Sequence, residues 1–590
     1  MPRCTNGTSM MKISSINYLY PNMIRYSISS IDQLPYHLQV KVVFQAKENL
    51  VKAVIPFWRP GRYERGIFPK NFIGLKAEAK GAELQTEKIQ GNLMNVHAEA
   101  GDTVTISYLL YSRELTAGNT YVDDELLLIN PVNACLYIEG LENEPCELKL
   151  TIPEKWAVST ALERLSDSTY RARDMQHLMD TPIMAAANVD VLQYEVEGVP
   201  YFIHLIGGYV GSDHQLVEDF KAFTRRQIKV FGSIPVKEYH FLIILMPHRA
   251  YHGVEHENST VIILGPSGNL GERSLYKELL GVSSHELYHT WNIKYIRPAD
   301  WTPYDFTQPD YSRMGYVAEG VTTYMGDVML WQSGFFSDEE YMNELALLLK
   351  RHNDNDGRFN LSLADSSIDT WVDGYGRGTP RRRVSIYVEG ALLAFVCDAW
   401  LLEATNGEMS LSTAMQRLYK KVDPAKGYSE EEYWSILSEM ADCNWEALRN
   451  DVVDGKGHLE KYAKEAIAKL GLNLEQKSSA DKLEQKFGVK LQKVGSKQMI
   501  WNVSPNSPAE TGRLYFDDEV KFINGIEPEK FLSENERLPE KLHLNVESGF
   551  RKKTIELETD GGKYGFQFTI GKGDSSLFEA WKGVQTAKEV

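Results

Sequence analysis

Apolar and polar residues alternate along the first third of the chain as they do in half-buried β-strands. Leu38, Val40 and Val42 are separated by polar residues, and a similar run recurs at 104–111. Turn-forming pairs with glycine or proline separate such runs. The pattern predicts a β-rich, sandwich-like domain over residues 1–185.

The pattern changes beyond residue 186. Strand-like runs alternate with one helical run, 214–229, and after residue 270 apolar residues recur at helical spacing as far as about residue 470. Pro298 is expected to end one of these helices and Gly334 another. The reason is that proline cannot continue a helix, whereas glycine readily adopts the left-handed conformation that follows one.

Short β-like runs return near the C-terminus, after a polar stretch at 475–486 that we interpret as a linker or an exposed helix. A chain of 590 residues is too long for a single hydrophobic core. The expected fold class is therefore α+β and multidomain. The predicted parts are the β-rich domain (1–185), a mixed domain of strands and helices (186–345), a helical domain (346–474), a compact αβ domain (475–575) and a C-terminal tail (576–590).

Charge narrows the function by exclusion. The formal net charge is −17, whereas a nucleic-acid-binding surface needs clustered lysine and arginine. The arginine-rich run at 377–384 is too short to change this and is interpreted as a solvated turn. We predict no nucleic-acid partner.

The cysteines and the N-terminus bear on the cellular compartment. No cysteine lies in a CxxC pair, so neither a disulfide framework nor a thiolate zinc site is indicated, and a reducing compartment is expected. The N-terminus lacks the apolar core of a secretory signal, and no segment is long enough to span a membrane. We predict a cytoplasmic protein, with Met10 and Met11 as alternative starts. The five cysteines are Cys4, Cys135, Cys146, Cys397 and Cys443.

The run HELYH at 285–289 carries the first candidate chemistry. On a helix, His285 and His289 lie one turn apart on one face, where both imidazoles can bind one zinc ion. Glu286 beside them can act as a general base toward a zinc-activated water. The alternative is a chance match on an ordinary amphipathic helix. In either case the helix is expected to run as far as Pro298.

A catalytic zinc ion needs a third protein ligand. Glu319 lies 30 residues beyond His289, on a second predicted helix. Its apolar sequence context is unusual for the alternative, a solvated helix face. Thr323 and Asp327 follow at helical spacing and are expected to contact a zinc-bound histidine. A carboxylate at this position would complete a His-His-Glu site for one zinc ion per chain.

Two further residues fit peptide hydrolysis, although each is a weak signal on its own. Glu255, in HGVEHENST, could hold the free α-amino group of a substrate. Tyr387 begins an apolar helix and could donate a hydrogen bond to the oxyanion of a tetrahedral intermediate. A tyrosine at such a place is more often a packing residue.

Taken together, these segments resemble the glycyl aminopeptidase family of zinc metallopeptidases, gluzincins that carry a C-terminal PDZ domain. The resemblance covers nearly the whole chain. It is most specific in HELYHTWNIKYIRP, which extends well past the generic zinc motif. The other resembling segments are FWRPGRYE (57–64), HLMDTPI (177–183), HGVEHENST, AEGVTTY, SLADSSIDTW (362–371) and YVEGALLAF.

The resemblance implies a thermolysin-like catalytic domain over 186–345, similar to that of the larger alanyl aminopeptidases. It also implies removal of small N-terminal residues, such as glycine and alanine, from peptide substrates. The implied site residues are the zinc ligands His285, His289 and Glu319, the base Glu286, the amine-binding Glu255 and the oxyanion-stabilising Tyr387.

The sequence departs from the family pattern at two positions near the site. His252 stands where a glycine is usual, which could narrow the substrate cleft or change its polarity. Glu389 stands where a lysine is often found, two residues after Tyr387. Neither residue is an implied zinc ligand, so the departures bear on substrate preference rather than on activity.

The C-terminal part resembles a PDZ domain, from FGVKL (487–491) onward. A short helix is expected over Ser507–Ala509, and a strand is expected to end at Asn524-Gly525. PDZ grooves bind extended peptides, so a peptide ligand is possible; the alternative is a structural appendage that packs on the catalytic domain. Arg513 and Asp517 stand where turn glycines are usual.

Two other functions stay open from the sequence. One is an endopeptidase of the same fold. The other is a peptide-binding protein that uses a PDZ-like domain and retains an idle zinc site. The complete ligand set and the retained Glu286 argue against the idle zinc site, and equal cleavage of N-acetylated peptides would indicate the endopeptidase.

Overall fold

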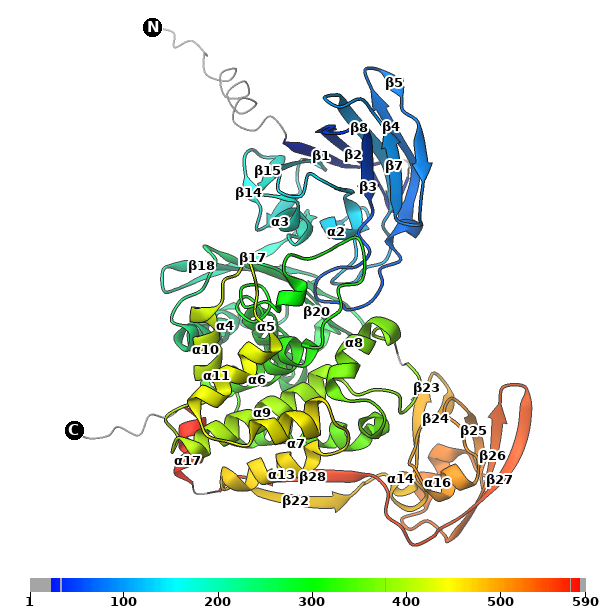
Figure 1. The fold of residues 1–590 in the computed structure, drawn as a ribbon. Coiled ribbons are helices and arrows are strands. Elements are labelled where there is room, and N and C mark those ends of the chain that lie inside the picture. Colours follow the sequence, from blue (N-terminus) through cyan, green and yellow to red (C-terminus); the bar gives the residue numbers. More distant parts are fainter. Residues whose placement is uncertain (1–22, 32–33, 377, 574, 584–590) are drawn as a thin grey trace, which may run out of the picture.

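The computed structural model describes residues 23–31, 34–376, 378–573 and 575–583. A β-rich part, a mixed part and a helical part follow one another along the chain, and a separate small sheet lies beside the helical part (Figure 1). The predicted α+β multidomain class, with a β-rich N-terminal part and helices in the C-terminal half, is confirmed. Cys4 and the two alternative start methionines lie outside the described residues.

The N-terminal part contains three sheets. The largest has the strand order β14-β15-β12-β1-β2-β8-β4-β5, and the others have the orders β13-β16-β10-β9 and β11-β3-β7-β6. In β2 the alternation seen in the sequence buries Leu38, Val40 and Val42. The elements are β1 (Ile24–Ser30), β2 (His37–Gln45), β3 (Leu50–Val54), β4 (Phe72–Ala79), β5 (Ala82–Glu83), β6 (Thr86–Lys88), β7 (Leu93–His97), β8 (Thr103–Tyr111), β9 (Tyr121–Val122), β10 (Leu126–Ile129), α2 (Pro131–Ala134), β11 (Tyr137–Ile138), β12 (Cys146–Thr151), β13 (Ala157–Thr160), β14 (Glu163–Arg164), β15 (Thr169–Ala172), α3 (Met175–Met179) and β16 (Ile183–Ala186).

The mixed part is built on a five-stranded sheet of order β17-β18-β19-β21-β20. β18, β19 and β21 are parallel, and β20 runs antiparallel to β21 at the edge of the sheet. Helix α5 packs on β20 and β21, and it also packs on α6. The elements are β17 (Asp190–Val196), β18 (Val199–Ile206), α4 (Asp213–Phe231), β19 (Tyr239–Leu245), β20 (Ala250–Glu255), β21 (Ser259–Gly265), α5 (Arg273–Tyr288), the π-helical turn η4 (Tyr316–Val321) and α6 (Thr322–Gln332).

The helical part surrounds α9, which is apolar on all sides and almost entirely buried. A helix of this kind can only lie inside a bundle. Gly334 follows α6 in the left-handed conformation, as expected. The helices are α7 (Asp338–Asp354), α8 (Leu363–Asp373), α9 (Ile386–Ala404), α10 (Leu411–Lys421), α11 (Glu430–Met440), α12 (Trp445–Leu448) and α13 (Leu459–Lys469).

The C-terminal part is a five-stranded antiparallel sheet of order β23-β24-β25-β26-β27 with its own hydrophobic cluster. A second, two-stranded sheet joins β22 to β28. The elements are β22 (Asn473–Ser478), α14 (Lys482–Phe487), β23 (Val489–Val494), β24 (Lys497–Val503), α15 (Pro508–Thr511), β25 (Glu519–Ile523), α16 (Pro528–Glu534), β26 (Lys541–Ser548), β27 (Arg551–Glu558), β28 (Phe566–Gly571) and α17 (Ser576–Trp581).

Two expectations about this end of the chain are wrong. The stretch 475–486 is neither a linker nor an exposed helix, because it begins in strand β22 and ends in helix α14, where Leu483 is buried. The tail from 576 begins with helix α17, whose Phe578 and Trp581 are buried against Trp331 of α6. The polar sequence of 475–486 gave no apolar pattern from which β22 and α14 could be predicted. Helix α17 is held by aromatic contacts with the distant helix α6.

One hydrophobic cluster runs through the N-terminal, mixed and helical parts, from Ile24 to Trp581. A smaller cluster joins β10 and β16 of the N-terminal part to the face of the five-stranded sheet that carries Leu242 and Val254. The N-terminal part is therefore fixed against the sheet that positions the candidate site. No helix among the described residues is long and apolar enough to cross a membrane, and the four cysteines that the structure describes are free thiols.

Candidate metal centre and active site

Helix α5 brings His285 and His289 together as expected. Their Nε2 atoms lie 3.0 Å apart. The Nδ1 atom of His289 lies 2.9 Å from the carbonyl oxygen of Asn292. A bond there puts the hydrogen on Nδ1 and leaves the Nε2 lone pair free for a metal ion.

We predicted that this helix runs as far as Pro298. That prediction is wrong, because the helix ends at Tyr288. The residues that follow form a tight loop, in which Ile293 has a φ of 108° and the backbone N–H of Lys294 donates to the carbonyl of His289. Asn292 holds this loop by donating to the carbonyl oxygens of Val317 and Ala318. Contacts with a distant segment therefore end the helix earlier than the proline requires.

Glu319 meets the two histidines from the π-helical turn η4. Its Oε2 atom lies 3.6 Å from Nε2 of His285 and 3.4 Å from Nε2 of His289. A tetrahedral zinc ion with bonds of about 2.0–2.1 Å separates its ligand atoms by about 3.3–3.4 Å. The three donor atoms therefore have the spacing and chemistry of a zinc site.

Charge and burial favour the ligand forms of Glu319 and His285, but they keep His289 protonated until a metal ion binds. Burial opposes ionisation of Glu319, but the charge of His289 and hydrogen bonds from both histidines hold its pKa below its usual value. Burial lowers the pKa of His285. Burial also opposes a charge on His289, yet the carboxylates of Glu255 and Glu319 raise its pKa to about 9. A metal ion would replace the proton as the partner of these carboxylates.

Two further carboxylates face the same point. Glu255, Glu286 and His289 also offer ligand-type atoms within 4.8 Å of one another. Both glutamates are buried, and one oxygen of each (Oε1 of Glu255 and Oε2 of Glu286) has no hydrogen-bond partner among the described residues. Burial is the largest cause of the raised pKa of Glu286. Buried carboxylate oxygens without partners are costly, which indicates that they bind groups from outside the protein.

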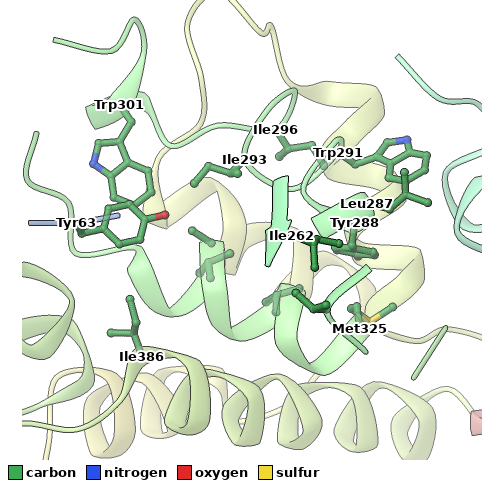
Figure 2. Close-up of a cluster of buried hydrophobic side chains, with 14 of the residues drawn as sticks. Tyr63, Ile262, Leu287, Tyr288, Trp291, Ile293, Ile296, Trp301, Met325 and Ile386 are labelled. Atoms are coloured by element: carbon green, nitrogen blue, oxygen red, sulfur yellow. The ribbon is translucent and has the colours of Figure 1, made fainter. Parts of the chain in front are cut away.

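The N-terminal part contributes to the site through the segment 57–64. The hydroxyl of Tyr63 donates to Oε1 of Glu319 at 2.8 Å. Its ring stacks on Trp301, with ring centroids 4.9 Å apart (Figure 2). Gly61 packs against Glu255 so closely that a Cβ there would lie 2.3 Å from Oε2. Sequence reasoning missed these roles, because FWRPGRYE was noted only for its resemblance.

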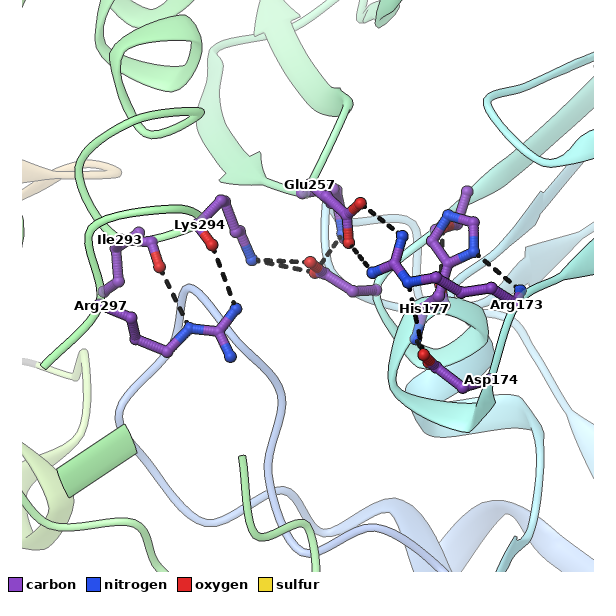
Figure 3. Close-up of polar contacts among 10 residues, drawn as sticks. Arg173, Asp174, His177, Glu257, Ile293, Lys294 and Arg297 are labelled. Atoms are coloured by element: carbon purple, nitrogen blue, oxygen red, sulfur yellow. Dashed lines mark hydrogen bonds and ion pairs between the residues drawn. The ribbon is translucent and has the colours of Figure 1, made fainter. Parts of the chain in front are cut away.

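A buried ion pair fixes the loop after the zinc-motif helix. Lys294 donates to both carboxylate oxygens of Asp180, at 3.0 and 3.1 Å, and Nδ1 of His256 lies 3.2 Å from the same carboxylate. Figure 3 shows Lys294 together with a second ion pair, in which Arg173 donates to Glu257. The cluster ties 177–183 of the N-terminal part to the residues that follow Glu255 and His289.

The contact with a metal-site histidine that we expected from Thr323 and Asp327 comes instead from Thr322. Its Oγ1 atom lies 3.5 Å from Nδ1 of His289. Neither Thr323 nor Asp327 has a hydrogen bond to a histidine among the described residues, and burial raises the pKa of Asp327 to about 7. The expectation assumed α-helical spacing from Glu319, whereas the structure has a π-helical turn there.

Tyr387 lies beside the histidines, at the start of α9. Its ring centroid is 6.4 Å from that of His285, and its hydroxyl is 3.2 Å from the hydroxyl of Tyr375. Tyr375 is a second site residue that sequence reasoning missed. It is 312 residues away from Tyr63, which bonds to it, so no local pattern could reveal it.

The two departures from the family pattern lie apart from the candidate metal ligands. Strand alternation places His252 on the opposite face of β20 from Gly253 and Glu255. A Cβ at Gly253 would lie 2.2 Å from Oε1 of Glu286, so this glycine lets the strand approach the base. Glu389 is buried, and its Oε2 atom lies 2.6 Å from Nδ1 of His352.

The arginine-rich run is not a solvated turn. Arg382 and Arg383 form ion pairs with Asp373 of α8. Arg381 binds the C-terminal part, where it pairs with Glu510 of α15 at 2.6 Å and donates to the carbonyl of Val503 at the end of β24. The run therefore joins the residues before Tyr387 to the C-terminal part.

Comparison with known proteins gives two family matches. Residues 25–187 match the Peptidase M61 N-terminal domain, and residues 278–393 match the M61 glycyl aminopeptidase family. A search of curated proteins finds no match to the chain.

Solved structures of similar fold include an aminopeptidase N family protein from Idiomarina loihiensis. Its sequence is 24% identical, and the two structures superpose with a TM-score of 0.87. The match covers 96% of this chain and 100% of that chain. At this identity the likeness shows the fold. An M1 zinc metallopeptidase from Deinococcus radiodurans is more distant, with 13% identity, a TM-score of 0.44 and coverage of 75% of this chain and 93% of that chain.

Proposed function

The chain belongs to the M61 glycyl aminopeptidase family, and on that premise we propose that it removes single small residues, glycine or alanine, from peptide N-termini by zinc-dependent hydrolysis. The observation that carries the proposal is the group of His285, His289 and Glu319, of which His289 and Glu319 are buried, with Glu255 and Glu286 close to it. Three ligands for a metal and two free carboxylate oxygens meet the needs of an exopeptidase.

The residues divide the work as follows. His285, His289 and Glu319 would hold a zinc ion, and the chemistry it would supply there is Lewis-acid activation of a carbonyl group and of water. Glu286 takes a proton from the attacking water and passes it to the leaving amine. Tyr387 donates its hydroxyl hydrogen to the oxyanion.

Glu255 makes the enzyme an exopeptidase in this proposal. Its Oε1 atom accepts a hydrogen bond from the substrate α-ammonium group and fixes the position of the first peptide bond. The exposed edge of β20, next to Glu255, offers backbone groups to an extended substrate.

The test uses two substitutions that preserve shape. Glu286→Gln should abolish hydrolysis of glycyl and alanyl anilides while bound zinc, measured by atomic emission, stays at one per chain. Glu255→Gln should raise KM strongly for substrates with a free amine. Glu257→Gln is the matched control, because Glu257 lies two residues away and pairs with Arg173. Full activity of the Glu286→Gln variant would refute the mechanism. Cleavage of N-acetylated peptides at the same rate as peptides with a free amine would indicate an endopeptidase.

We further propose that residues 475–575 form a PDZ-like domain. Arg513 and Asp517 have φ values of 60° and 65°, the left-handed region in which glycine is usual. This supports the expectation that they replace turn glycines. Strand β23 lies at the edge of the sheet, where a peptide could add as a further strand. Titration with a library of C-terminal peptides tests binding, and the absence of binding would favour a structural appendage.

A further inference from the structure

Tyr387 has a polar neighbour that the proposed mechanism does not yet use. The hydroxyl oxygens of Tyr375 and Tyr387 are 3.2 Å apart, and both side chains line a cavity of about 320 Å³. The two tyrosines are therefore neighbours in the wall of one cavity.

Tyr375 is held from three sides by the N-terminal segment. Its hydroxyl accepts a hydrogen bond from the backbone N–H of Tyr63 at 3.4 Å. Its own backbone N–H donates to Glu64 at 3.1 Å. The guanidinium of Arg62 lies over its ring, 5.0 Å from the centroid. Although the residue is partly exposed, its position is fixed.

The count of hydrogens determines what this arrangement does. A phenol has one hydrogen to donate and oxygen lone pairs to accept with. Either hydroxyl can donate in this pair. The oxygen of Tyr375 already accepts from Tyr63, and in one of the two states its own hydrogen points at the oxygen of Tyr387. In that state the hydrogen of Tyr387 is not used within the protein and can be donated to a substrate. In the reverse state Tyr387 donates to Tyr375 and has no hydrogen left for an oxyanion.

We propose that Tyr375 is a positioning residue that donates to Tyr387, fixes its phenol and directs its single hydrogen toward the substrate oxyanion. This inference rests on the proposed function of the same site. The segment 62–64 supplies the contacts that hold Tyr375, so the N-terminal part orients the oxyanion donor as well as the carboxylate of Glu319. The two effects come from one residue, Tyr63, through its backbone N–H and its hydroxyl.

The test is a double-mutant cycle with Tyr375→Phe and Tyr387→Phe on the full chain loaded with zinc. Phenylalanine keeps both rings and removes only the hydroxyl groups. Tyr387→Phe should lower kcat for alanyl anilide about 100-fold or more. Tyr375→Phe should lower kcat about tenfold with KM within about twofold. The double variant should match Tyr387→Phe within about twofold, since Tyr375 acts only through Tyr387.

Inhibitor binding gives a second readout. A phosphinic dipeptide that mimics the tetrahedral intermediate should bind Tyr375→Phe about tenfold more weakly, whereas binding of free alanine should be unchanged. Tyr311→Phe is the matched control, because it removes the hydroxyl of an exposed tyrosine that contacts Trp371. It should behave as wild type.

The outcomes separate this inference from the function on which it rests. A wild-type enzyme without aminopeptidase activity overturns both. An active wild type whose Tyr375→Phe variant keeps full kcat overturns this inference alone. The same holds if the losses of the two single variants multiply in the double variant, because Tyr375 would then act independently of Tyr387.

Discussion

Asp180→Asn is expected to destabilise the protein more than any exposed substitution, because it leaves the ammonium group of Lys294 buried without a full countercharge. The two side chains are only 6% and 1% exposed. They join the N-terminal part to the loop after the zinc-motif helix. The replacement keeps the size of the side chain and one acceptor oxygen.

The magnitude follows from burial. Removing one partner of a buried ion pair costs about 3–5 kcal/mol, since the remaining charge loses its compensation. The pKa of Asp180 gives an independent figure: burial opposes its ionisation, but Lys294 and His256 lower the pKa from 3.8 to about 2. This shift corresponds to about 2 kcal/mol in favour of the charged form. We expect a loss near 3 kcal/mol, because the aspartate still accepts one hydrogen bond as asparagine.

The assay is urea unfolding at pH 7, followed by tryptophan fluorescence. Asp423→Asn is the control, because Asp423 is half exposed and pairs with Lys426 on the surface. It should change the free energy of unfolding by less than about 1 kcal/mol. Combining Asp180→Asn with Lys294→Met should restore part of the loss, since no buried charge of this pair then remains.

The pH dependence has a defined sign. The folded-state pKa of Asp180 is lower than its ordinary value, so its contribution is present above about pH 3.8 and is lost as the pH falls toward about 2. The difference between wild type and Asp180→Asn should therefore be constant from about pH 5 to 8. A loss in the free energy of unfolding below about 1 kcal/mol at pH 7 would refute the reasoning. So would a double variant that loses more free energy of unfolding than the two single variants lose together.

Three more predictions concern the site. Tyr63→Phe keeps the stack on Trp301 but removes the bond to Glu319, so zinc affinity in a chelator competition should fall about 10–100-fold; unchanged affinity would show that the bond does not orient the ligand. Gly253→Ala places a Cβ 2.2 Å from Oε1 of Glu286, so kcat should fall about tenfold or more. The control is Gly281→Ala, which should keep wild-type kcat because the added Cβ meets open space. Removal of zinc with 1,10-phenanthroline should abolish activity and lower Tm, because ligand at about 100 times its Kd contributes about 2.7 kcal/mol; equal Tm values with and without metal would contradict this.

Local patterns in the sequence predicted the elements that depend on local chemistry. Alternation located strand β2, and the HExxH spacing brought His285 and His289 together on α5. The end of that helix could not be predicted from Pro298. The loop at 289–296 is held by Asn292, which bonds to residues 25 and 26 positions further along the chain.

The rest of the candidate site depends on contacts between distant segments. Tyr63 bonds to Glu319 across 256 residues of sequence. Neither residue alone carries a periodic or motif signal for that contact, since a buried tyrosine has the same local pattern whatever it touches. A different reason applies to Thr323: its expected contact assumed α-helical spacing from Glu319, and that spacing does not reveal the π-helical turn.

The segment 57–64 also has a consequence for the life of the enzyme. It supplies the bond to Glu319 and the hold on Tyr375, although the histidines lie more than 200 residues later in the chain. Because the chain is made from its N-terminus, this segment is present before the histidines are, and the site is complete only when the two parts have docked. We therefore expect hydrolysis to require the N-terminal part docked against Glu319 and Tyr375. Limited proteolysis that releases this part should switch the activity off while HELYH stays intact.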